Sequence, residues 1–170
     1  MRIFIFLFFL VLCPVSAFAW EGRVVEVMDG NTIVVEQAAG GDRVKIRLFG
    51  IDTPELRQPF GQEAKKFVAH TALDKHVDIK PLDIKPSNQG MGRDGHGHMS
   101  AIVAIPDEGI LQEMLLTKGL TWVYPQHCLS LDCASWESLQ KQATQKGKGL
   151  WAEKNPIPPW EWRRQNRNYP

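Results

Sequence analysis

An arginine, two carboxylates and a hydroxyl group lie within the nine residues from Arg47 to Glu55. Asp52 stands where an alternating apolar run ends, and Glu55 follows it on a predicted turn. Pro54 holds the residue before it in an extended conformation, so the carbonyl of Thr53 has a defined direction. Carboxylate and carbonyl oxygens are the ligands that hard cations such as Ca²⁺ prefer, which makes this segment a candidate cation site.

A second polar turn, Asp29-Gly30-Asn31-Thr32, separates two β-branched runs earlier in the chain. In a meander of three strands, the end of the third strand can approach the turn between the first two. Asn31 would then add an amide oxygen, without charge, to the oxygens of Asp52 and Thr53. The alternative is that both segments are ordinary tight turns, since each sequence is also typical of a turn.

The hydrophobic pattern predicts the elements that position these turns. β-branched and alternating apolar runs predict five strands, at residues 23–28, 32–36, 44–51, 76–84 and 99–105. Apolar residues at helical spacing predict three helices, at 62–73, 110–118 and 134–146. The glycine-rich stretch 85–97 predicts a long loop. Together these elements predict an α+β fold, mainly β, with the five-stranded OB-fold barrel and about three helices as the natural candidate.

The N-terminus has the pattern of a secretory signal peptide. Arg2 precedes the apolar run 3–12, and Ala17-Phe18-Ala19 is a typical cleavage site. This apolar run is too short to span a bilayer, and a tight membrane anchor or a lipoprotein linked through Cys13 are the weaker alternatives. The prediction divides the chain into a signal peptide (1–19), a folded domain (20–154) and a tail rich in Pro, Trp and Arg (155–170). We expect a periplasmic or secreted protein with no stable membrane insertion after cleavage.

The composition narrows the functions that the chain could have. Its 170 residues include 20 Lys and Arg against 19 Asp and Glu, and a net charge of +1 excludes a polybasic surface as the source of any nucleic-acid affinity. Cys128 and Cys133 are the cysteines that remain after cleavage. In an exported chain they predict one disulfide that closes a short loop, with a pair of free thiols as the alternative. The sequence offers no second cysteine pair for a zinc site.

The two polar segments resemble the signature segments of the micrococcal nuclease (thermonuclease, staphylococcal nuclease-like) family. Val27–Thr32 matches one of them, and Arg47–Glu55 matches the other. The resemblance extends over residues 22–164, through Gln58–Gly61, Gly119–Tyr124, Gly149–Trp151 and a tail, Asn155–Arg163, similar to that of exported members from Gram-negative bacteria. It implies an OB-fold and a calcium-dependent phosphodiesterase that acts on DNA and RNA.

The resemblance also implies a role for each matching residue. Arg47 would clamp the scissile phosphate, and Glu55 would position or deprotonate the attacking water. Asp52 and the Thr53 carbonyl would be calcium ligands, with Asp29 just outside them. These roles agree with the chemistry, because in-line attack builds negative charge on the phosphate oxygens and a carboxylate can take the proton of the water.

The chain departs from the family pattern at two places. Asn31 stands where the family usually has Asp, which predicts weaker calcium binding because affinity follows ligand charge. The family's Tyr-Gly-Arg before the fifth strand is here His96-Gly97-His98. His98 could act as a leaving-group acid or as a weak substitute for that arginine. Alternatively, Arg93 could take the place of the arginine.

Two further interpretations of the histidines stay open from the sequence. They could be exposed loop residues that bind no metal. His96 and His98 could also bind a transition metal as a His-x-His pair, although spacing shows no third ligand among His70, His76 and His127.

The tail also has two interpretations. Pro156, Pro158 and Pro159 favour a rigid extended strap whose tryptophans cover the barrel. Alternatively, the interleaved aromatic and cationic residues could stack on bases and contact phosphates. These residues are Trp160, Trp162, Arg163, Arg164 and Arg167.

Three hypotheses about function follow from these observations. The leading one is an exported, calcium-dependent nuclease that acts on DNA and/or RNA as a monomer. The second is an OB-fold module that binds nucleic acid or protein without turnover, and Asn31 and His98 motivate it. The third is a periplasmic metal-binding protein based on its histidines. Glu55 separates them best, because only the nuclease needs it.

Overall fold

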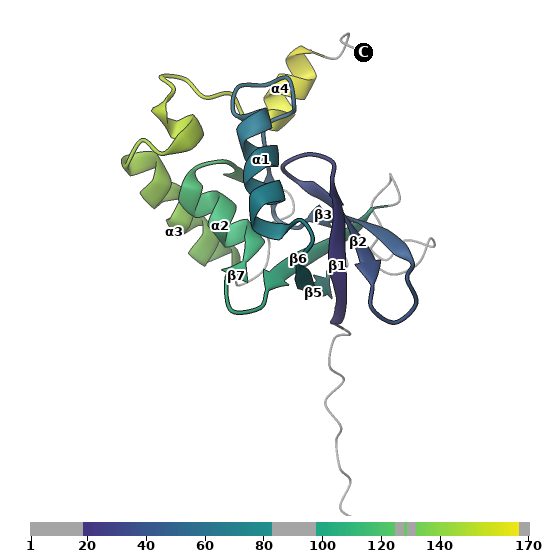
Figure 1. Cartoon of the computed structure of the whole chain (residues 1–170). Helices are drawn as coiled ribbons and strands as arrows, with labels where there is room; N and C mark the ends of the chain where they lie inside the picture. The colour runs from purple at the N-terminus through teal and green to yellow at the C-terminus, as the bar shows by residue number, and fades with distance from the viewer. Residues whose placement is uncertain (1–18, 83–97, 125–127, 129–131, 167–170) are drawn as a thin grey trace, which may run out of the picture.

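Five strands form a closed barrel in the computed structural model, which describes residues 19–82, 98–124, 128 and 132–166. The strand order is β3-β2-β1-β5-β6, and a parallel pairing of β3 with β6 closes the barrel. The fold class predicted from the sequence, an OB-like barrel with appended helices, is confirmed (Figure 1). The strands are β1 (Trp20–Val27), β2 (Thr32–Gln37), β3 (Arg43–Leu48), β5 (His76–Pro81) and β6 (Met99–Ile105).

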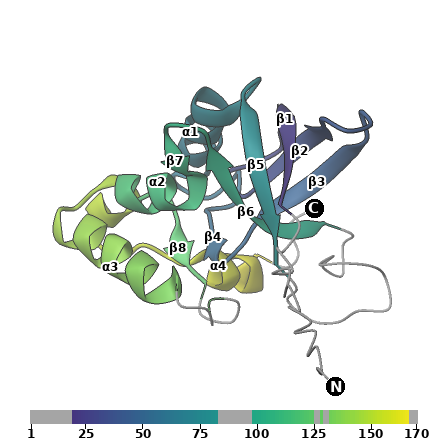
Figure 2. The ribbon, with the colours of Figure 1, turned by 90° about the horizontal axis from the view of Figure 1, so that it is seen from below.

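The predicted meander is present, because β1 pairs antiparallel with β2 and β2 with β3. Alternate residues of these strands point into the core, where Val24, Ile33 and Ile46 are fully buried. Helix α1 (Gly61–Ala72) packs its small apolar face, Ala64, Val68 and Ala72, against this core. Helices α2 (Leu111–Lys118) and α3 (Asp132–Gln145) lie on the side of α1 away from β1, β2 and β3 (Figures 1 and 2).

One predicted strand, 44–51, is interrupted in the structure. β3 ends at Leu48, Gly50 takes a left-handed conformation with φ +70°, and β4 (Ile51–Asp52) pairs with β8 (Trp122–Val123) in a separate sheet. Apolar residues continue through this turn, from Leu48 and Phe49 to Ile51, although their alternation changes phase there. After the break the chain leaves the barrel, so Asp52 lies on β4 and not on a barrel strand.

Replacing Gly50 by Ala is expected to lower the free energy of unfolding by at least about 2 kcal/mol. A methyl group there would meet φ +70° and lie 2.7 Å from the buried ring of Trp136. Denaturant unfolding of the Ala variant measures the loss. Gly40 has open space around it, so Gly40→Ala is the control, and equal stability of the two variants would contradict the assignment.

The remaining elements are short. They are β7 (Gly109–Ile110), the 3₁₀ helix η1 (Gly149–Ala152) and α4 (Pro159–Gln165). Gly119 ends α2 in a left-handed conformation. Residues 85–97, the predicted long loop, lie outside the described residues. Within the part of the chain that is described, no helix is both long enough and apolar enough to cross a membrane.

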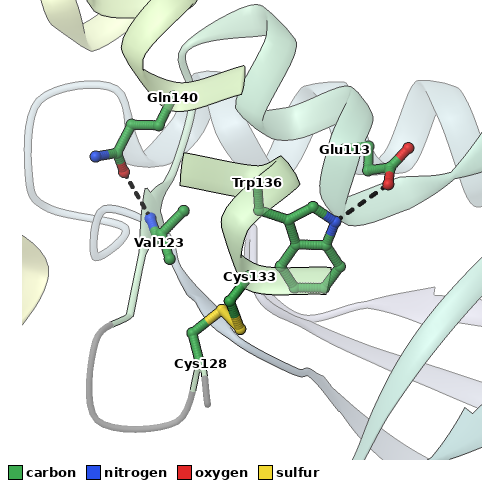
Figure 3. Close-up of a disulfide and its surroundings, with 6 residues drawn as sticks. All are labelled: Glu113, Val123, Cys128, Cys133, Trp136 and Gln140. Atoms are coloured by element: carbon green, nitrogen blue, oxygen red, sulfur yellow. Dashed lines mark hydrogen bonds between the residues drawn. A yellow bond between two sulfur atoms is a disulfide. The ribbon is translucent and has the colours of Figure 1, made fainter. Parts of the chain in front are cut away.

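The predicted disulfide joins Cys128 to Cys133, at the start of α3 (Figure 3). Its neighbour Trp136 is buried, and the indole nitrogen of Trp136 donates a hydrogen bond to Glu113 of α2 at 3.1 Å. Farther along α3, the side-chain oxygen of Gln140 accepts a hydrogen bond from the backbone nitrogen of Val123 at 2.7 Å. These contacts fasten α3 to α2 and β8, and β8 in turn pairs with β4, which carries Asp52.

Candidate active site

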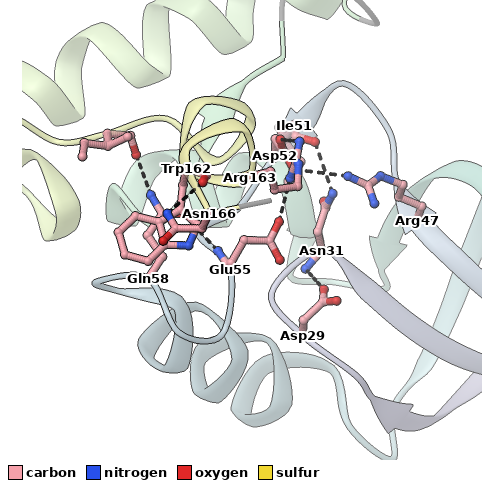
Figure 4. A network of polar contacts seen from close by, with 11 residues as sticks. Asp29, Asn31, Arg47, Ile51, Asp52, Glu55, Gln58, Trp162, Arg163 and Asn166 are labelled. Carbon is pink, nitrogen blue, oxygen red and sulfur yellow. Dashed lines mark hydrogen bonds and ion pairs between the residues drawn. The ribbon is translucent and has the colours of Figure 1, made fainter. Parts of the chain in front are cut away.

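The turn between β1 and β2 meets the end of β3, as the meander predicts. The backbone nitrogen of Leu48 donates a hydrogen bond to the carbonyl of Asn31 at 2.9 Å. The side-chain nitrogen of Asn31 donates to the carbonyl of Ile51 at 3.4 Å (Figure 4). Gly30 packs so closely that a Cβ there would lie 2.9 Å from the hydroxyl of Thr53. The two polar segments singled out in the sequence therefore form one site.

The side-chain oxygen of Asn31 is an orphaned buried acceptor. Asn31 is 4% exposed, and its Oδ1 has no hydrogen-bond partner. The backbone nitrogen of the same residue donates to the carboxylate of Asp29 at 2.7 Å, which fixes the turn. A buried acceptor without a partner is costly, so its presence points to a ligand at this place.

The carboxylate of Asp52 is buried between two arginines. Its side chain is 3% exposed. Arg47 of β3 contacts Oδ1 at 3.2 Å, and Arg163 of α4 contacts Oδ2 at 2.7 Å. A buried carboxylate is stable only with such partners, so both cations belong to the structure of the site.

Glu55 faces the same space from a more open position. Its carboxylate is 42% exposed and accepts a hydrogen bond from Nη1 of Arg163 at 2.7 Å. Its backbone nitrogen donates to the side chain of Gln58 at 3.1 Å, and Gln58 donates in turn to the carbonyl of Ile157 in the tail. The loop that carries Glu55 is thus fastened to the chain segment before α4.

Arg163 is the one residue that contacts both carboxylates among the described contacts (Figure 4). Burial alone would lower the pKa of its guanidinium. Hydrogen bonds and attraction from Asp52 and Glu55 outweigh burial and raise that pKa above its ordinary value. Arg163 is therefore a permanent positive charge at the centre of the site.

An open cleft of about 310 Å³ leads to this group. One wall comes from the turn at Asp29 and the loop at Glu55, and the other comes from α4. The lining residues are Asp29, Glu55, Leu56, Arg57, Trp162, Arg163 and Asn166.

The available donors fit a hard cation. Asp52 provides a carboxylate, Asn31 an unpartnered amide oxygen and Thr53 a backbone carbonyl, and all three residues are buried. Among the described residues there is no group of three or more His, Cys, Asp or Glu side chains that could hold a metal. Such oxygen donors match Ca²⁺ better than a transition metal.

The structure places the predicted histidine beside the site strand. His98 directly precedes β6, whose Ser100 pairs with Arg47. The ion pairs of Asp52 and Glu55 within the described residues are made by Arg47 and Arg163. His96, His127 and Arg93 lie outside the described residues, so their predicted roles stay predictions.

Sequence reasoning missed the place of Arg163. It treated Arg163 as one cation of the tail, and its preferred interpretation was an extended strap. The backbone is extended at Pro158, but Pro159 begins α4, because proline suits the first position of a helix. Trp160 does cover the fold, with its ring 5.4 Å from that of Tyr124.

Comparison with known proteins finds relatives that are named as nucleases. Residues 45–153 match the family described as staphylococcal nuclease homologue. A protein of Haemophilus influenzae named an uncharacterized endonuclease is 35% identical over 95% of this chain and 83% of its own. One of the same name from Escherichia coli O157:H7 is 32% identical over 91% and 92%. The micrococcal nuclease of Shigella flexneri is 27% identical over 93% and 90%.

Proposed function

Because the chain belongs to the staphylococcal nuclease family, we propose that it is a calcium-dependent nuclease that hydrolyses phosphodiester bonds of DNA and/or RNA. The observation that carries this proposal is the meeting of Asp52 and Glu55 at one guanidinium. Two carboxylates that share one cation lie close enough to act on one phosphate group. The family similarity supports a nuclease, and the calcium and the substrates are the finer parts of the proposal.

Three oxygens would hold the calcium ion: the Asp52 carboxylate, the Thr53 carbonyl and Oδ1 of Asn31. When bound, the ion supplies positive charge for the phosphate oxygens, which become more negative during attack. The unpartnered state of Asn31 Oδ1 supports this assignment. With Asn in place of a carboxylate, the ligand charge is low, so the working calcium concentration should be high.

The protein residues would divide the remaining work. Arg47 is 34% exposed and can donate two parallel hydrogen bonds to the non-bridging phosphate oxygens. Glu55 is open to water and can accept the proton of the attacking water. The leaving oxygen needs a proton, and His98 stays the candidate for it, beside the strand of Arg47.

We propose that this enzyme acts outside the cytoplasm, after removal of residues 1–19, and as a monomer. The signal-peptide pattern supports the location. The disulfide between Cys128 and Cys133 is consistent with an oxidising compartment.

Fluorogenic DNA and RNA cleavage by residues 20–170 tests the proposed reaction. We expect cleavage in millimolar calcium and only background in chelator, because the phosphate charge needs the cation. The assay compares calcium, magnesium and chelator from pH 6 to 10. Equal cleavage with calcium and with chelator would refute the calcium dependence. Absence of cleavage under every condition would favour the binding module instead.

A further inference from the structure

Arg163 reaches the candidate site from the far end of the chain. It lies 111 residues after Asp52, yet it makes three hydrogen bonds with Asp52 and Glu55. Two of the three are 2.7 Å long, the length of strong charge-assisted bonds. An arginine in an incidental surface ion pair would rarely contact two carboxylates at once when each of them is buried or half-buried.

The helix that carries Arg163 is built into the fold. Pro159, at its first turn, is buried. The ring of Trp160 packs against Tyr124 at 5.4 Å, and Gln58 binds the carbonyl of Ile157 just before the helix. These contacts hold α4 against the cleft independently of Arg163, so the guanidinium is presented to the site from a fixed support.

Arg163 contacts the carboxylate that we assign to the metal ion. Both oxygens of Asp52 are taken by guanidinium groups, Oδ1 by Arg47 and Oδ2 by Arg163. A cation needs at least one of these oxygens, and the shorter contact is the one made by Arg163. Arg163 likewise contacts an oxygen of Glu55. Each of these oxygens can accept a second contact, but a cation bound at Asp52 would be repelled by the adjacent guanidinium, which favours movement of Arg163.

The released guanidinium still has a use in the cleft. Arg47 and Arg163 both contact Asp52, and Arg163 also lines the open cleft, through which a phosphate would arrive. Attack on a phosphodiester develops negative charge on more than one oxygen. A second guanidinium, that of Arg163, would stabilise the charge on the oxygens that Arg47 does not contact.

We propose that Arg163 holds the place of the cation on Asp52 in the metal-free protein and becomes a second phosphate-binding arginine when the metal binds. This inference rests on the proposed nuclease function. It makes the C-terminal helix part of the substrate site. It also means that metal binding replaces the guanidinium of Arg163 on Asp52 by the metal ion.

Calcium titration calorimetry tests the exchange directly. Arg163→Ala is expected to bind Ca²⁺ at least about tenfold more tightly than the wild type, because the competing cation is gone. Arg164 follows in the same helix and makes no hydrogen bond or ion pair among the described contacts, so Arg164→Ala is the control for loss of charge. The control should change the affinity by less than about twofold.

Oligonucleotide binding tests the second role. In a Glu55→Gln background, which keeps the probe uncut, fluorescence anisotropy measures binding of a short single-stranded DNA in calcium. Adding Arg163→Ala should weaken binding about tenfold to a hundredfold, the effect of one charge-assisted contact. Adding Arg164→Ala should weaken it by less than about threefold.

Tighter calcium binding together with weaker oligonucleotide binding supports the proposal. Tighter calcium binding with stronger oligonucleotide binding would mean that Arg163 only blocks the site, and this result would overturn the proposal. Unchanged calcium affinity, or weaker binding of both ligands with a lowered melting temperature, would overturn it as well. Arg163→Gln, which keeps a polar side chain, replaces the Ala variant if that variant does not fold. Both experiments measure binding and not cleavage. If the wild-type protein fails to cleave, the proposed nuclease function is refuted, but the two binding results can still be interpreted.

Discussion

Replacing Glu55 by Gln should lower the rate of DNA cleavage about 100-fold to 10,000-fold, the range for loss of a general base. Gln keeps the size of the side chain and its place in the cleft, but it cannot take a proton from water. Glu55 suits this role because its carboxylate is open to solvent while its backbone is fastened by Gln58. Initial rates at saturating calcium measure the effect, with circular dichroism as the check on folding.

Glu63 supplies the matched control for this prediction. It lies on an exposed position of the first turn of α1, outside the residues that line the cleft. Glu63→Gln removes the same charge and should leave cleavage within about twofold of the wild type. Comparable losses in the two variants would mean that Glu55 acts only through the general charge of the protein, and the assigned role would be wrong.

Replacing Arg47 by Lys should lower kcat/KM for DNA about 100-fold to 1,000-fold, the effect of losing an aligned donor to the developing charge. Lysine keeps the positive charge but loses the planar fork that matches two phosphate oxygens. The position of Arg47 is set by β3 and by its contact with Asp52 at 3.2 Å, so the shorter, rounder ammonium cannot restore the geometry.

Arg43 lies on the same strand and provides the comparison. It is 68% exposed and pairs with Glu36 on the surface of the barrel. Arg43→Lys should change kcat/KM by less than about threefold. Near-normal activity of Arg47→Lys would show that charge alone suffices at this position, and the fork would then have no part in the reaction.

Local signals in the sequence were enough to predict much of the barrel and half of the site. β-branched runs and tight turns set the meander, and the turn at Asn31 then meets the strand that carries Arg47. The break at Gly50 escaped prediction because apolar residues stand on both sides of it, and one strand was predicted across the change of phase between Leu48 and Phe49. Only the packing against Trp136 and the pairing of β4 with β8 reveal why the chain turns there.

The place of Arg163 could not be predicted from any local pattern. Periodicity reports on neighbours within a few residues, whereas the partner of Arg163 lies 111 residues away. Three prolines within four residues led to the prediction of an extended strap, and the helix that begins at Pro159 was not predicted. Tertiary contacts with Tyr124 and Gln58 decide where the helix docks.

The distance along the chain between the two halves of the site has a consequence for folding. The turn at Asn31 and the strand with Arg47 meet through consecutive hairpins, contacts that form early because little chain entropy is lost. Arg163 must close a loop of more than 100 residues to reach Asp52, so its contact forms late. During folding we therefore expect the turn at Asn31 to meet the strand of Arg47 before Arg163 arrives, so a cation present at that stage would meet no competition from Arg163.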